Sequence, residues 1–378
     1  MQRDCDVLVC GASFAGLAVA RELAGTGARV LVIDRYEIGE RQTSACAMPT
    51  LWMDALDVRS ALRQTFDELV VHTPYVTSRW SLPWSFATFD YRELCAVMWQ
   101  QADDGDLEFE TATVTGREGL TVHTDRGSLR APLVVDALGW RRVLSNETPI
   151  QPPKARLSRG LEVHPHGSSE SMELWIDPRY VRAGYSWSFP AREELRVGVG
   201  SFWPEHHVKE PTVALARDLG LPAVRYQGNW IPHELRAAVE DEVFFVGDSA
   251  GQCLPLTAEG IRTALYFGIA CGRELRAAHA GRSTRADALA RYAAFSDGHS
   301  REFRWLLRAQ RLVGRITPNR ALSAAVRALE SPRLCAWAFD RYLAIAPPSF
   351  AGGERPRASA PAFTSYKLAG HAPGSSSR

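Results

Sequence analysis

A short apolar strand, a glycine turn and a helix of small residues follow one another at the start of the chain, and this order constrains the fold more than any other feature. Residues 5–10 predict the strand and residues 15–24 predict the helix. A second apolar run, residues 29–34, predicts the next strand. A strand, a helix and a strand in this order begin a parallel sheet, so we expect an α/β chain with a Rossmann-like domain.

The turn itself, residues 11–16, fits the dinucleotide-binding pattern G-x-G-x-x-G except that Ser13 replaces the middle glycine. Gly11 permits the tight turn, and Gly16 lets the helix and strand pack closely. Serine is the least bulky polar substitute where the backbone approaches a pyrophosphate, and the helix N-terminus offers free N–H groups to that anion. The turn therefore predicts a dinucleotide site with these contacts: Gly11, Ser13, Phe14, Ala15 and Gly16.

Asp34 ends the second strand, 18 residues beyond Gly16. An acid at this place accepts hydrogen bonds from the ribose hydroxyls of an adenosine, and it disfavours a 2′-phosphate. The site therefore suits FAD or NAD better than NADP. We count the neighbouring Arg35 in the same site.

A second glycine turn lies far along the chain, where residues 246–251 follow an apolar strand and residues 255–261 lead into a long helix. These residues resemble the fingerprint G-D-x-x-G-x-x-x-P-x-x-x-x-G-I of the p-hydroxybenzoate hydroxylase-like flavoprotein monooxygenases and the geranylgeranyl reductases. The resemblance implies FAD as the cofactor, with Asp248 on its ribityl chain. It also implies that Gly260 and Ile261 offer N–H groups to the flavin edge, and that Gly247 and Pro255 shape the turn.

Two smaller elements agree with this superfamily. Residues 134–139, which end at Gly139, resemble the strand-and-glycine element that closes over the adenosine half of FAD. Arg92, which opens a helix predicted over residues 92–102, resembles the arginine that reaches the FAD phosphates. The resemblance therefore adds Gly139 and Arg92 to the cofactor site.

Three aromatic residues alternate along a predicted strand: Tyr185, Trp187 and Phe189. Alternation places the three rings on one face of the strand. With Pro190 and Gly198, they resemble the pattern Y-x-W-x-F-P-x7-G of the geranylgeranyl reductases, whose aromatics line a cavity for a polyprenyl chain beside the flavin. The resemblance implies an apolar wall for an alkene. One buried sheet face is the plain alternative.

Cys46 lies in the loop after the second strand, where the reductases carry a cysteine close to the flavin, typically followed by glycine. Here Ala47 stands in place of that glycine, which is consistent with an altered substrate or a lost reductase role. We assign Cys46 or bound water as the proton donor of the reaction. A small buried thiol is the structural alternative.

The elements divide the chain into four parts. Residues 1–75, 91–150 and 241–285 are expected to form a discontinuous FAD-binding domain, and residues 76–90 and 151–240 an antiparallel substrate-binding sheet. Residues 286–346 are typical of helices with Arg-rich and apolar faces, and residues 347–378, dense in Pro, Ala, Gly and Ser, are expected to be disordered. The fold expected is therefore α/β with an added antiparallel sheet and helical segment, or α+β overall.

The composition limits which binding partners and which cellular compartment are expected. The 44 basic residues nearly cancel the 43 acidic ones, so no long-range field favours nucleic acid. The seven cysteines are scattered without a C-x-x-C pair, and no histidine spacing predicts a metal site. We therefore expect a cytoplasmic protein without a bound metal. The Arg-rich amphipathic helices leave peripheral membrane contact open.

The preferred interpretation is an FAD-dependent oxidoreductase that transfers hydride from reduced flavin to an alkene carbon of a prenyl or other hydrophobic substrate. The alternatives are a flavin monooxygenase or a halogenase, both acting through a C4a-hydroperoxide, and a non-catalytic flavoprotein that binds a lipid or partner. Residues 66–92 contain no lysine of the kind that halogenases need. No second dinucleotide pattern is present, so electrons are expected from NAD(P)H docking transiently or from a redox partner protein.

Overall fold

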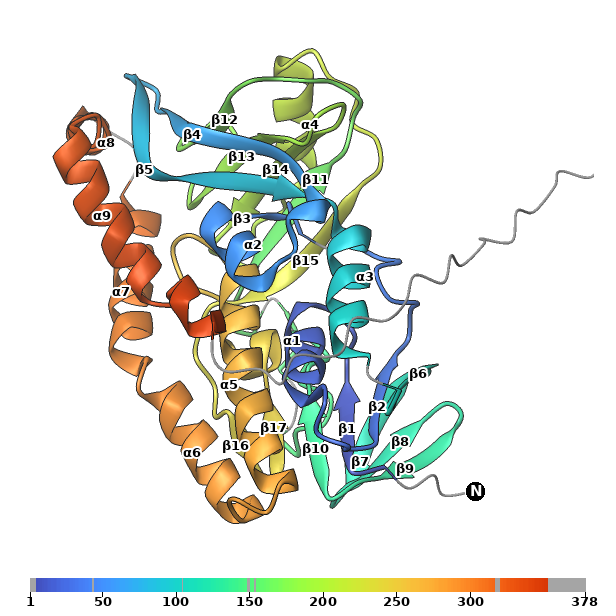
Figure 1. Cartoon of the computed structure of the whole chain (residues 1–378). Coiled ribbons are helices and arrows are strands. Elements are labelled where there is room, and N and C mark those ends of the chain that lie inside the picture. The colour runs from blue at the N-terminus through green and yellow to red at the C-terminus, as the bar shows by residue number, and fades with distance from the viewer. Residues whose placement is uncertain are drawn as a thin grey trace, which may run out of the picture.

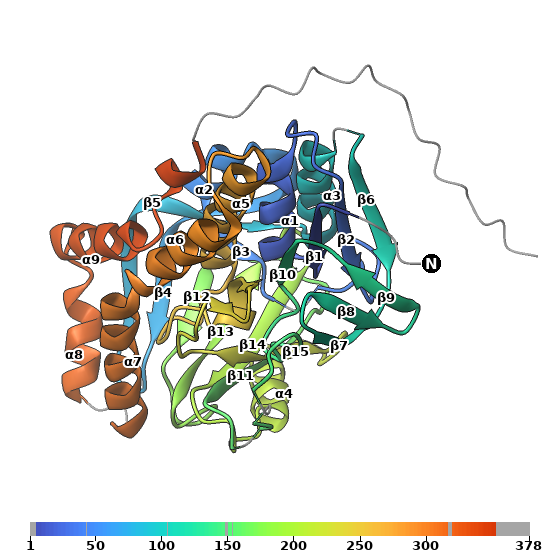
Figure 2. The ribbon, with the colours of Figure 1, turned by 90° about the horizontal axis from the view of Figure 1, so that it is seen from below.

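The computed structural model describes residues 5–42, 44–103, 105–147, 150–152, 154–316 and 320–352. Two large sheets and one small sheet form the body of the molecule (Figure 1). The C-terminal helices run along one side of it, as the view from below also shows (Figure 2). The mixed α/β architecture predicted from the sequence is confirmed.

The six-stranded sheet contains the N-terminal strand–helix–strand unit. β1 pairs in parallel with both β2 and β10, and β17 continues the parallel sheet beyond β10. Parallel neighbours need crossover connections, and helices supply them here. The strands lie in the order β16 (Val239–Glu240), β17 (Val243–Phe245), β10 (Leu133–Asp136), β1 (Val7–Cys10), β2 (Val30–Asp34) and β6 (Leu107–Thr111).

Helix α1 (Phe14–Leu23) lies in the centre of this layer, and all ten of its residues are buried. It packs between α3 (Tyr91–Ala102) and α5 (Ile261–His279) (Figure 1). The approach to α5 requires small residues, because a Cβ atom on Gly268 would lie 2.7 Å from the carbonyl oxygen of Ala15. The first helix therefore depends on a helix more than 200 residues away in the chain.

The eight-stranded sheet forms the second layer. Its neighbours are antiparallel except for the parallel pair β12–β4. The strands lie in the order β15 (Gln227–Pro232), β11 (Leu157–Val163), β14 (Leu195–Ser201), β13 (Gly184–Pro190), β12 (Met172–Trp175), β4 (Leu62–His72), β5 (Thr77–Phe89) and β3 (Ala47–Pro49).

Three segments join a different sheet from the one expected: β3, β4 and β16. The boundary predicted at residue 75 falls after β4, but β4 pairs with β5 and β12 in the eight-stranded sheet. Register shifts after Leu62 and Phe66 interrupt its alternation, so residues 62–72 lack the period-two pattern that marks a strand.

Residues 107–136 contain a short antiparallel meander at their centre. β7 (Val114–Glu118), β8 (Thr121–Thr124) and β9 (Gly127–Arg130) form a three-stranded sheet, whereas β6 and β10 belong to the parallel sheet. The remaining short elements are α2 (Thr50–Leu56), η1 (Arg59–Ala61), α4 (Lys209–Asp218) and η2 (Gly247–Ala250).

Helices α6 (Arg285–Asp297), α7 (Ser300–Arg315), α8 (Arg320–Ala328) and α9 (Pro332–Ala344) confirm the predicted helical segment. They are followed by η3 (Pro348–Gly352). The disorder expected from residue 347 is wrong for these last described residues, because the ring centroid of Phe350 lies 4.5 Å from that of Tyr266 and Ala351 is buried. Residues 353–378 of the predicted tail lie outside the described residues.

Candidate functional site

The first glycine turn is built from close backbone contacts. Gly11 has a φ of +113°, and a Cβ atom there would lie 2.3 Å from the carbonyl oxygen of Ala137. A Cβ atom on Gly16 would lie 1.8 Å from the carbonyl oxygen of Gly11. No larger residue fits at either place, so α1 begins directly against the strand ends. The other predicted contacts at this turn lie at the start of α1: Ser13, Phe14 and Ala15.

Asp34 lies at the end of β2, beside this turn. Its carboxylate accepts hydrogen bonds from the backbone N–H of Ala12 at 2.8 Å and of Tyr36 at 3.1 Å. The acid therefore holds the turn itself. Arg35 is exposed, with its guanidinium 4.8 Å from the ring centroid of Tyr36.

The start of α3 also lies against the first turn. The hydroxyl of Tyr91 donates to the Ser13 hydroxyl at 3.1 Å, and a Cβ atom on Gly39 would lie 2.9 Å from the Cα of Arg92. The Arg92 side chain is exposed and has no ion-pair partner among the described residues. The guanidinium of Arg92 therefore provides a positive charge, unpaired within the described residues, near the turn that was predicted to bind phosphates.

A buried acid joins the strand end at β10 to the second turn. The Ser249 hydroxyl donates to the Asp136 carboxylate at 2.6 Å and to the carbonyl of Gly139 at 3.0 Å. Asp136 also accepts from the backbone N–H groups of Leu138 and Leu144. Burial raises the pKa of Asp136 above its usual value. Gly139, with a φ of +83°, is thus fixed beside η2.

The second turn contains non-glycine residues with a strained backbone conformation, in addition to a glycine with a positive φ. Gly247 has a φ of +67° and donates its N–H to the side chain of Gln252 at 2.8 Å. Further on, Leu256 and Ala258 have φ values of +69° and +52°, which non-glycine residues rarely adopt. Gln310 of α7 holds this loop, since its side-chain oxygen accepts from the N–H of Leu256 at 2.7 Å. Such strain persists only where the surroundings impose it, and it clusters at functional sites.

The end of this loop is fixed by an ion pair with α5 and α9. The Glu259 carboxylate bonds the guanidinium of Arg262 at 2.7 Å, and the Arg262 side chain is fully buried. The hydroxyl of Tyr342 donates to the same carboxylate. Arg262 also donates to the carbonyl of Ala346 at 2.9 Å. The C-terminal helix therefore sets the position of the residues that precede α5.

Asp248 lies in η2 and faces the start of α5. A Cβ atom on Gly260, the residue before Ile261, would lie 3.6 Å from its carboxylate oxygen. Burial raises the pKa of Asp248 to about 6, although the charge of Arg236 opposes the rise. Pro255, which belongs to the same fingerprint, is buried in the loop between η2 and α5.

The two glycine turns meet. A Cβ atom on Gly247 would lie 3.0 Å from that of Ala15, so η2 touches the first turn of α1. The free N–H ends of α1 and α5 both belong to this region, because each helix starts at one of the two turns. The backbone therefore offers two positive helix ends within one cradle, as a long dinucleotide requires.

The aromatic residues of β13 lie over glycines of the neighbouring strands. Trp187 pairs with Gly198, and a Cβ atom there would lie 2.3 Å from the indole. The same indole lies 3.4 Å and 3.6 Å from the Cβ positions of Gly200 and Gly160. Its N–H donates to Glu162 at 3.0 Å. The spacing from Pro190 to Gly198 thus has a steric cause: the glycines leave the floor on which the indole lies.

The other two aromatics extend this surface in opposite directions. The ring centroids of Tyr185 and Trp187 are 6.0 Å apart, and those of Trp187 and Phe189 are 6.4 Å apart. The hydroxyl of Tyr185 donates to the carbonyl of Thr257 in the strained loop. Phe189 packs with an apolar cluster of the second sheet that also includes Phe66 and Phe339. The aromatic face therefore runs from the second turn to the C-terminal helices.

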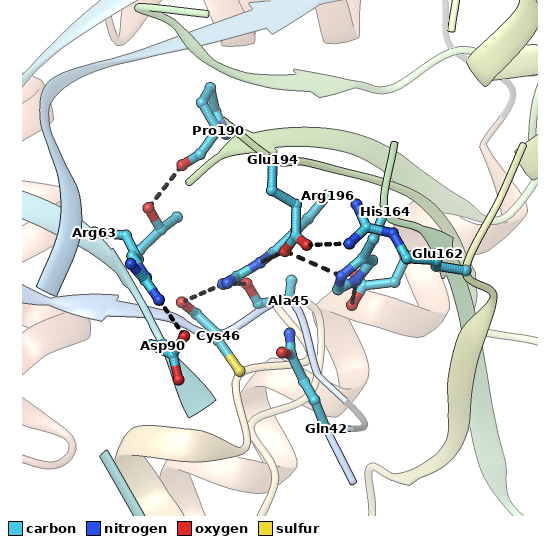
Figure 3. Close-up of polar contacts among 12 residues, drawn as sticks. Gln42, Ala45, Cys46, Arg63, Asp90, Glu162, His164, Pro190, Glu194 and Arg196 are labelled. Atoms are coloured by element: carbon cyan, nitrogen blue, oxygen red, sulfur yellow. Dashed lines mark hydrogen bonds and ion pairs between the residues drawn. The ribbon is translucent and has the colours of Figure 1, made fainter. Parts of the chain in front are cut away.

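Cys46 is buried and has a φ of +50°. Its carbonyl accepts from the guanidinium of Arg196 at 3.2 Å, and the same guanidinium donates to the carbonyl of Ala45 at 2.8 Å (Figure 3). It also donates to the carbonyl of Phe89 at 3.0 Å. Burial raises the pKa of the Cys46 thiol far above its usual value, although the charge of Arg196 acts in the opposite direction. The thiol is therefore protonated at neutral pH.

A row of buried charges connects Arg196 to the aromatic strand. Figure 3 shows Glu194 between the guanidinium of Arg196, at 3.2 Å, and the ring of His164, at 3.2 Å. The other ring nitrogen of His164 lies 3.0 Å from Glu162, which holds Trp187. Burial raises the pKa of Glu194, but the bonds from His164 and Arg196 outweigh it and bring the pKa to about 2. One network therefore supports both Cys46 and Trp187.

This network was not predicted from the sequence, and no role was assigned to Arg196 or Glu162. One signal was present: Arg196 interrupts an otherwise apolar strand, and a charge at such a place is retained only with partners. The contacts of His164 to two glutamates give it a structural role. Glu259 and Gln310 carried no comparable signal.

The residues present fit a flavin dinucleotide. The tight glycine contacts, the two helix ends and the strained loop form a backbone cradle. Larger side chains in place of the glycines would fill this cradle. No group of histidine, cysteine and acidic side chains among the described residues could hold a metal ion. Two surface hollows of about 460 and 390 Å³ lie beside α7 and are lined by none of the predicted site residues.

Comparisons with known proteins agree with the cradle. Residues 4–104 match the family model of an FAD binding domain. Digeranylgeranylglycerophospholipid reductase 3 of Methanosphaera stadtmanae is 24% identical over 331 residues, which span 79% of this chain and 83% of that protein. A reductase of the same name from Methanothrix thermoacetophila is 24% identical over 322 residues, 76% of this chain and 82% of that protein. FAD is therefore the cofactor.

Solved structures share the fold. A geranylgeranyl bacteriochlorophyll reductase-like protein of Thermoplasma acidophilum superposes with a TM-score of 0.79 at 16% identity, covering 93% of this chain and 98% of that one. PqsL of P. aeruginosa, in complex with 2-aminobenzoylacetate, superposes with a TM-score of 0.65 at 19% identity, covering 89% of this chain and 100% of that one. At these identities the superpositions show the fold alone.

Proposed function

Because the chain is an FAD-dependent oxidoreductase of the geranylgeranyl reductase family, within the monooxygenase-like superfamily, we propose that it reduces carbon–carbon double bonds of a prenyl or other hydrophobic substrate. FAD supplies a hydride when it is reduced and bound. The chain's own residues then have three tasks: they hold the cofactor, place the alkene, and deliver a proton.

We assign the cofactor contacts to the two turns. Asp34 would bind the ribose hydroxyls, Arg92 the phosphates and Asp248 the ribityl chain, with the N–H groups of Gly260 and Ile261 at the flavin edge. The remaining predicted contacts would line the same cradle: Gly11, Ser13, Phe14, Ala15, Gly16, Arg35, Gly139, Gly247 and Pro255. The contact between Gly247 and Ala15 supports this assignment, because it brings both turns to one place.

The substrate wall consists of Tyr185, Trp187 and Phe189 in this proposal. The single observation that carries it is the bond from Tyr185 to Thr257, since this bond joins the aromatic strand to the loop beside Asp248. An alkene lying on the indole of Trp187 would then be next to the cofactor. In the same proposal, the FAD-binding domain is built around the parallel sheet and the substrate-binding domain around the eight-stranded sheet.

Cys46 is the proton donor that we propose. Its buried thiol carries a proton at neutral pH, and Arg196 close by would stabilise the thiolate left after transfer. Water would then restore the thiol. Replacement by serine or alanine is expected to slow alkene saturation, while the reduction of bound FAD by an external donor remains unchanged.

The electron donor and the compartment also belong to the proposal. NAD(P)H docking transiently or a redox partner protein would reduce the cofactor. No disulfide bond joins the cysteines within the described residues, which suits a reducing cytoplasm. No helix of the described residues is long and apolar enough to cross a membrane. Peripheral membrane contact belongs to the same proposal.

The test is anaerobic reoxidation of the reduced holoenzyme by prenyl lipids, compared with reoxidation by oxygen. Fast reoxidation by the alkene, with a saturated product detected by mass spectrometry, is expected. A Gly198→Ala variant should lose this reaction and keep FAD, because its methyl group would displace Trp187. Reoxidation by oxygen alone, with a hydroxylated product, would instead establish the monooxygenase alternative.

A further inference from the structure

The outer face of α7 carries an unusual combination of side chains. Its exposed positions recur every three or four residues and form one continuous stripe. Three of them are large and apolar: Trp305 is 65% exposed, Leu312 59% and Ile316, just after the helix, 39%. The other exposed positions of the stripe are all arginines: Arg301, Arg304, Arg308, Arg311 and Arg315.

The stripe contains no acid, and its charges are uncompensated. None of these five arginines has an ion-pair partner among the residues that the structure describes. The only acid of α7, Glu302, lies off the stripe and is half-buried. Exposed tryptophan and leucine among arginines are typical of helices that lie in the interface of an anionic membrane.

Helix α9 repeats the pattern more weakly. Leu334 is 39% exposed and Trp337 56%, and the guanidinium of Arg341 lies 4.7 Å from the Trp337 ring centroid. Residues 300–344 contain nine arginines against three acids, in a chain whose net charge is only +1. The positive charge is therefore concentrated in the helices along one side of the molecule (Figures 1 and 2).

The inner sides of α8 and α9 cover the apolar cluster around Phe189. Val326 of α8 and Phe339 of α9 pack with Phe189, and Trp80 donates its N–H to the carbonyl of Val326 at 2.9 Å. Helices α8 and α9 therefore lie between the proposed substrate wall and solvent.

We propose that the stripe of α7, with Leu334 and Trp337 of α9, is the face by which the protein docks on an anionic lipid bilayer. A second copy of the chain does not fit this face, because a two-fold contact would place arginines against arginines. The proposal deepens the proposed function, since a prenyl substrate would be drawn from that bilayer. Vesicle binding is measured without turnover, so either proposal can fail alone.

The test is co-sedimentation of the FAD-loaded protein with phosphatidylcholine vesicles, with and without one-third phosphatidylglycerol. Binding to the anionic vesicles, weakened by salt, is expected. Each basic side chain near such a surface contributes roughly a five-fold factor. The triple variant Arg304→Gln, Arg308→Gln, Arg315→Gln should therefore bind on the order of 100-fold more weakly. The double variant Trp305→Ser, Leu312→Ser should lose binding even at low salt.

A matched control removes the same charge elsewhere. Arg126, Arg130 and Arg182 are exposed and lie outside the helices, so their replacement by glutamine should leave vesicle binding within two-fold. Equal FAD content and melting temperature would show that all variants are folded. Unchanged binding by both stripe variants would overturn the proposal, and so would self-association that the stripe variants abolish in the absence of lipid.

Discussion

The two glycine turns are held in place by different kinds of contact. The first is fixed mainly by backbone packing, because a Cβ atom on Gly11 or Gly16 would collide with a carbonyl oxygen, and Asp34 and Tyr91 add one hydrogen bond each. The second is fixed by side chains from distant elements, among them Gln310 of α7 and Tyr342 of α9. A turn of the first kind is specified locally, whereas a turn of the second kind depends on the whole fold.

The largest effect is expected from Gly16→Ala, which tests whether the first turn depends on sterics alone. The new methyl group would lie 1.8 Å from a backbone oxygen that cannot move aside. We expect destabilisation of about 3 kcal/mol or more and colourless protein, measured by urea unfolding and flavin content.

Gly27→Ala is the control, because Gly27 has a φ of +69° but nothing within 4 Å of its Cβ position, so its cost comes from backbone strain without a collision. It should cost about 1 kcal/mol and keep its FAD. Equal losses of stability and flavin in the two variants would contradict the steric account of the first turn.

Glu259→Gln tests the second turn through its ion pair. Arg262 would keep its bonds to backbone carbonyls but lose the buried carboxylate. Breaking a buried pair costs roughly 3 kcal/mol, so a lower unfolding free energy and faster proteolysis near residues 254–259 are expected. Glu330→Gln removes an exposed acid 3.8 Å from Arg327 and should change stability by less than about 0.5 kcal/mol. An equal effect of the two substitutions would contradict the account.

Asp248→Asn should have opposite effects on stability and on cofactor binding. The folded pKa of Asp248, about 6, lies above its unfolded value, so its contribution to apoprotein stability is complete at low pH and is lost as the pH rises through 6. Asparagine removes this loss. We expect an apoprotein that melts higher at pH 7.5, with a flatter profile between pH 4 and 6.

The same variant should bind FAD about ten-fold more weakly, the usual scale for one charge-assisted hydrogen bond. Calorimetry of the apoprotein and fluorescence titration with FAD measure the two effects. A variant that gained FAD affinity would sink the ribityl assignment.

Gln310→Ala should give the smallest effect and the sharpest contrast. It removes one acceptor from the N–H of Leu256, for a cost of about 1 kcal/mol. Hydrogen exchange should rise at residues 254–258 and stay unchanged at residues 11–16. Faster exchange at both turns would mean that they form one cooperative unit.

The difference between the two glycine turns also explains which features could be predicted from the sequence. The first turn, Asp34 and the aromatic alternation of Tyr185, Trp187 and Phe189 were readable because period, glycine spacing and short-range geometry determine them. The position of Gly198 was readable only as a pattern, and its cause, the indole of Trp187 lying on it, required the sheet register.

The rest could not be predicted because it depends on residues distant in sequence. Nothing near Arg196 indicates that its partners are Cys46 and Phe89, which lie more than 100 residues away. The bulges in β4 removed the alternation by which its sheet could be recognised. Gln310, the partner of Leu256, lies on α7, and Tyr342, which bonds Glu259 besides Arg262, lies on α9; no local pattern specifies the packing of these two helices.

The complete burial of α1 has a consequence for biosynthesis. One side of that helix is closed only by α5, which ends at residue 279, so a growing chain exposes an apolar helix until most of the polypeptide has left the ribosome. Residues 4–104, although they match a recognised cofactor family, are therefore not an independent folding unit. FAD can therefore bind only late, after the second glycine turn has been translated.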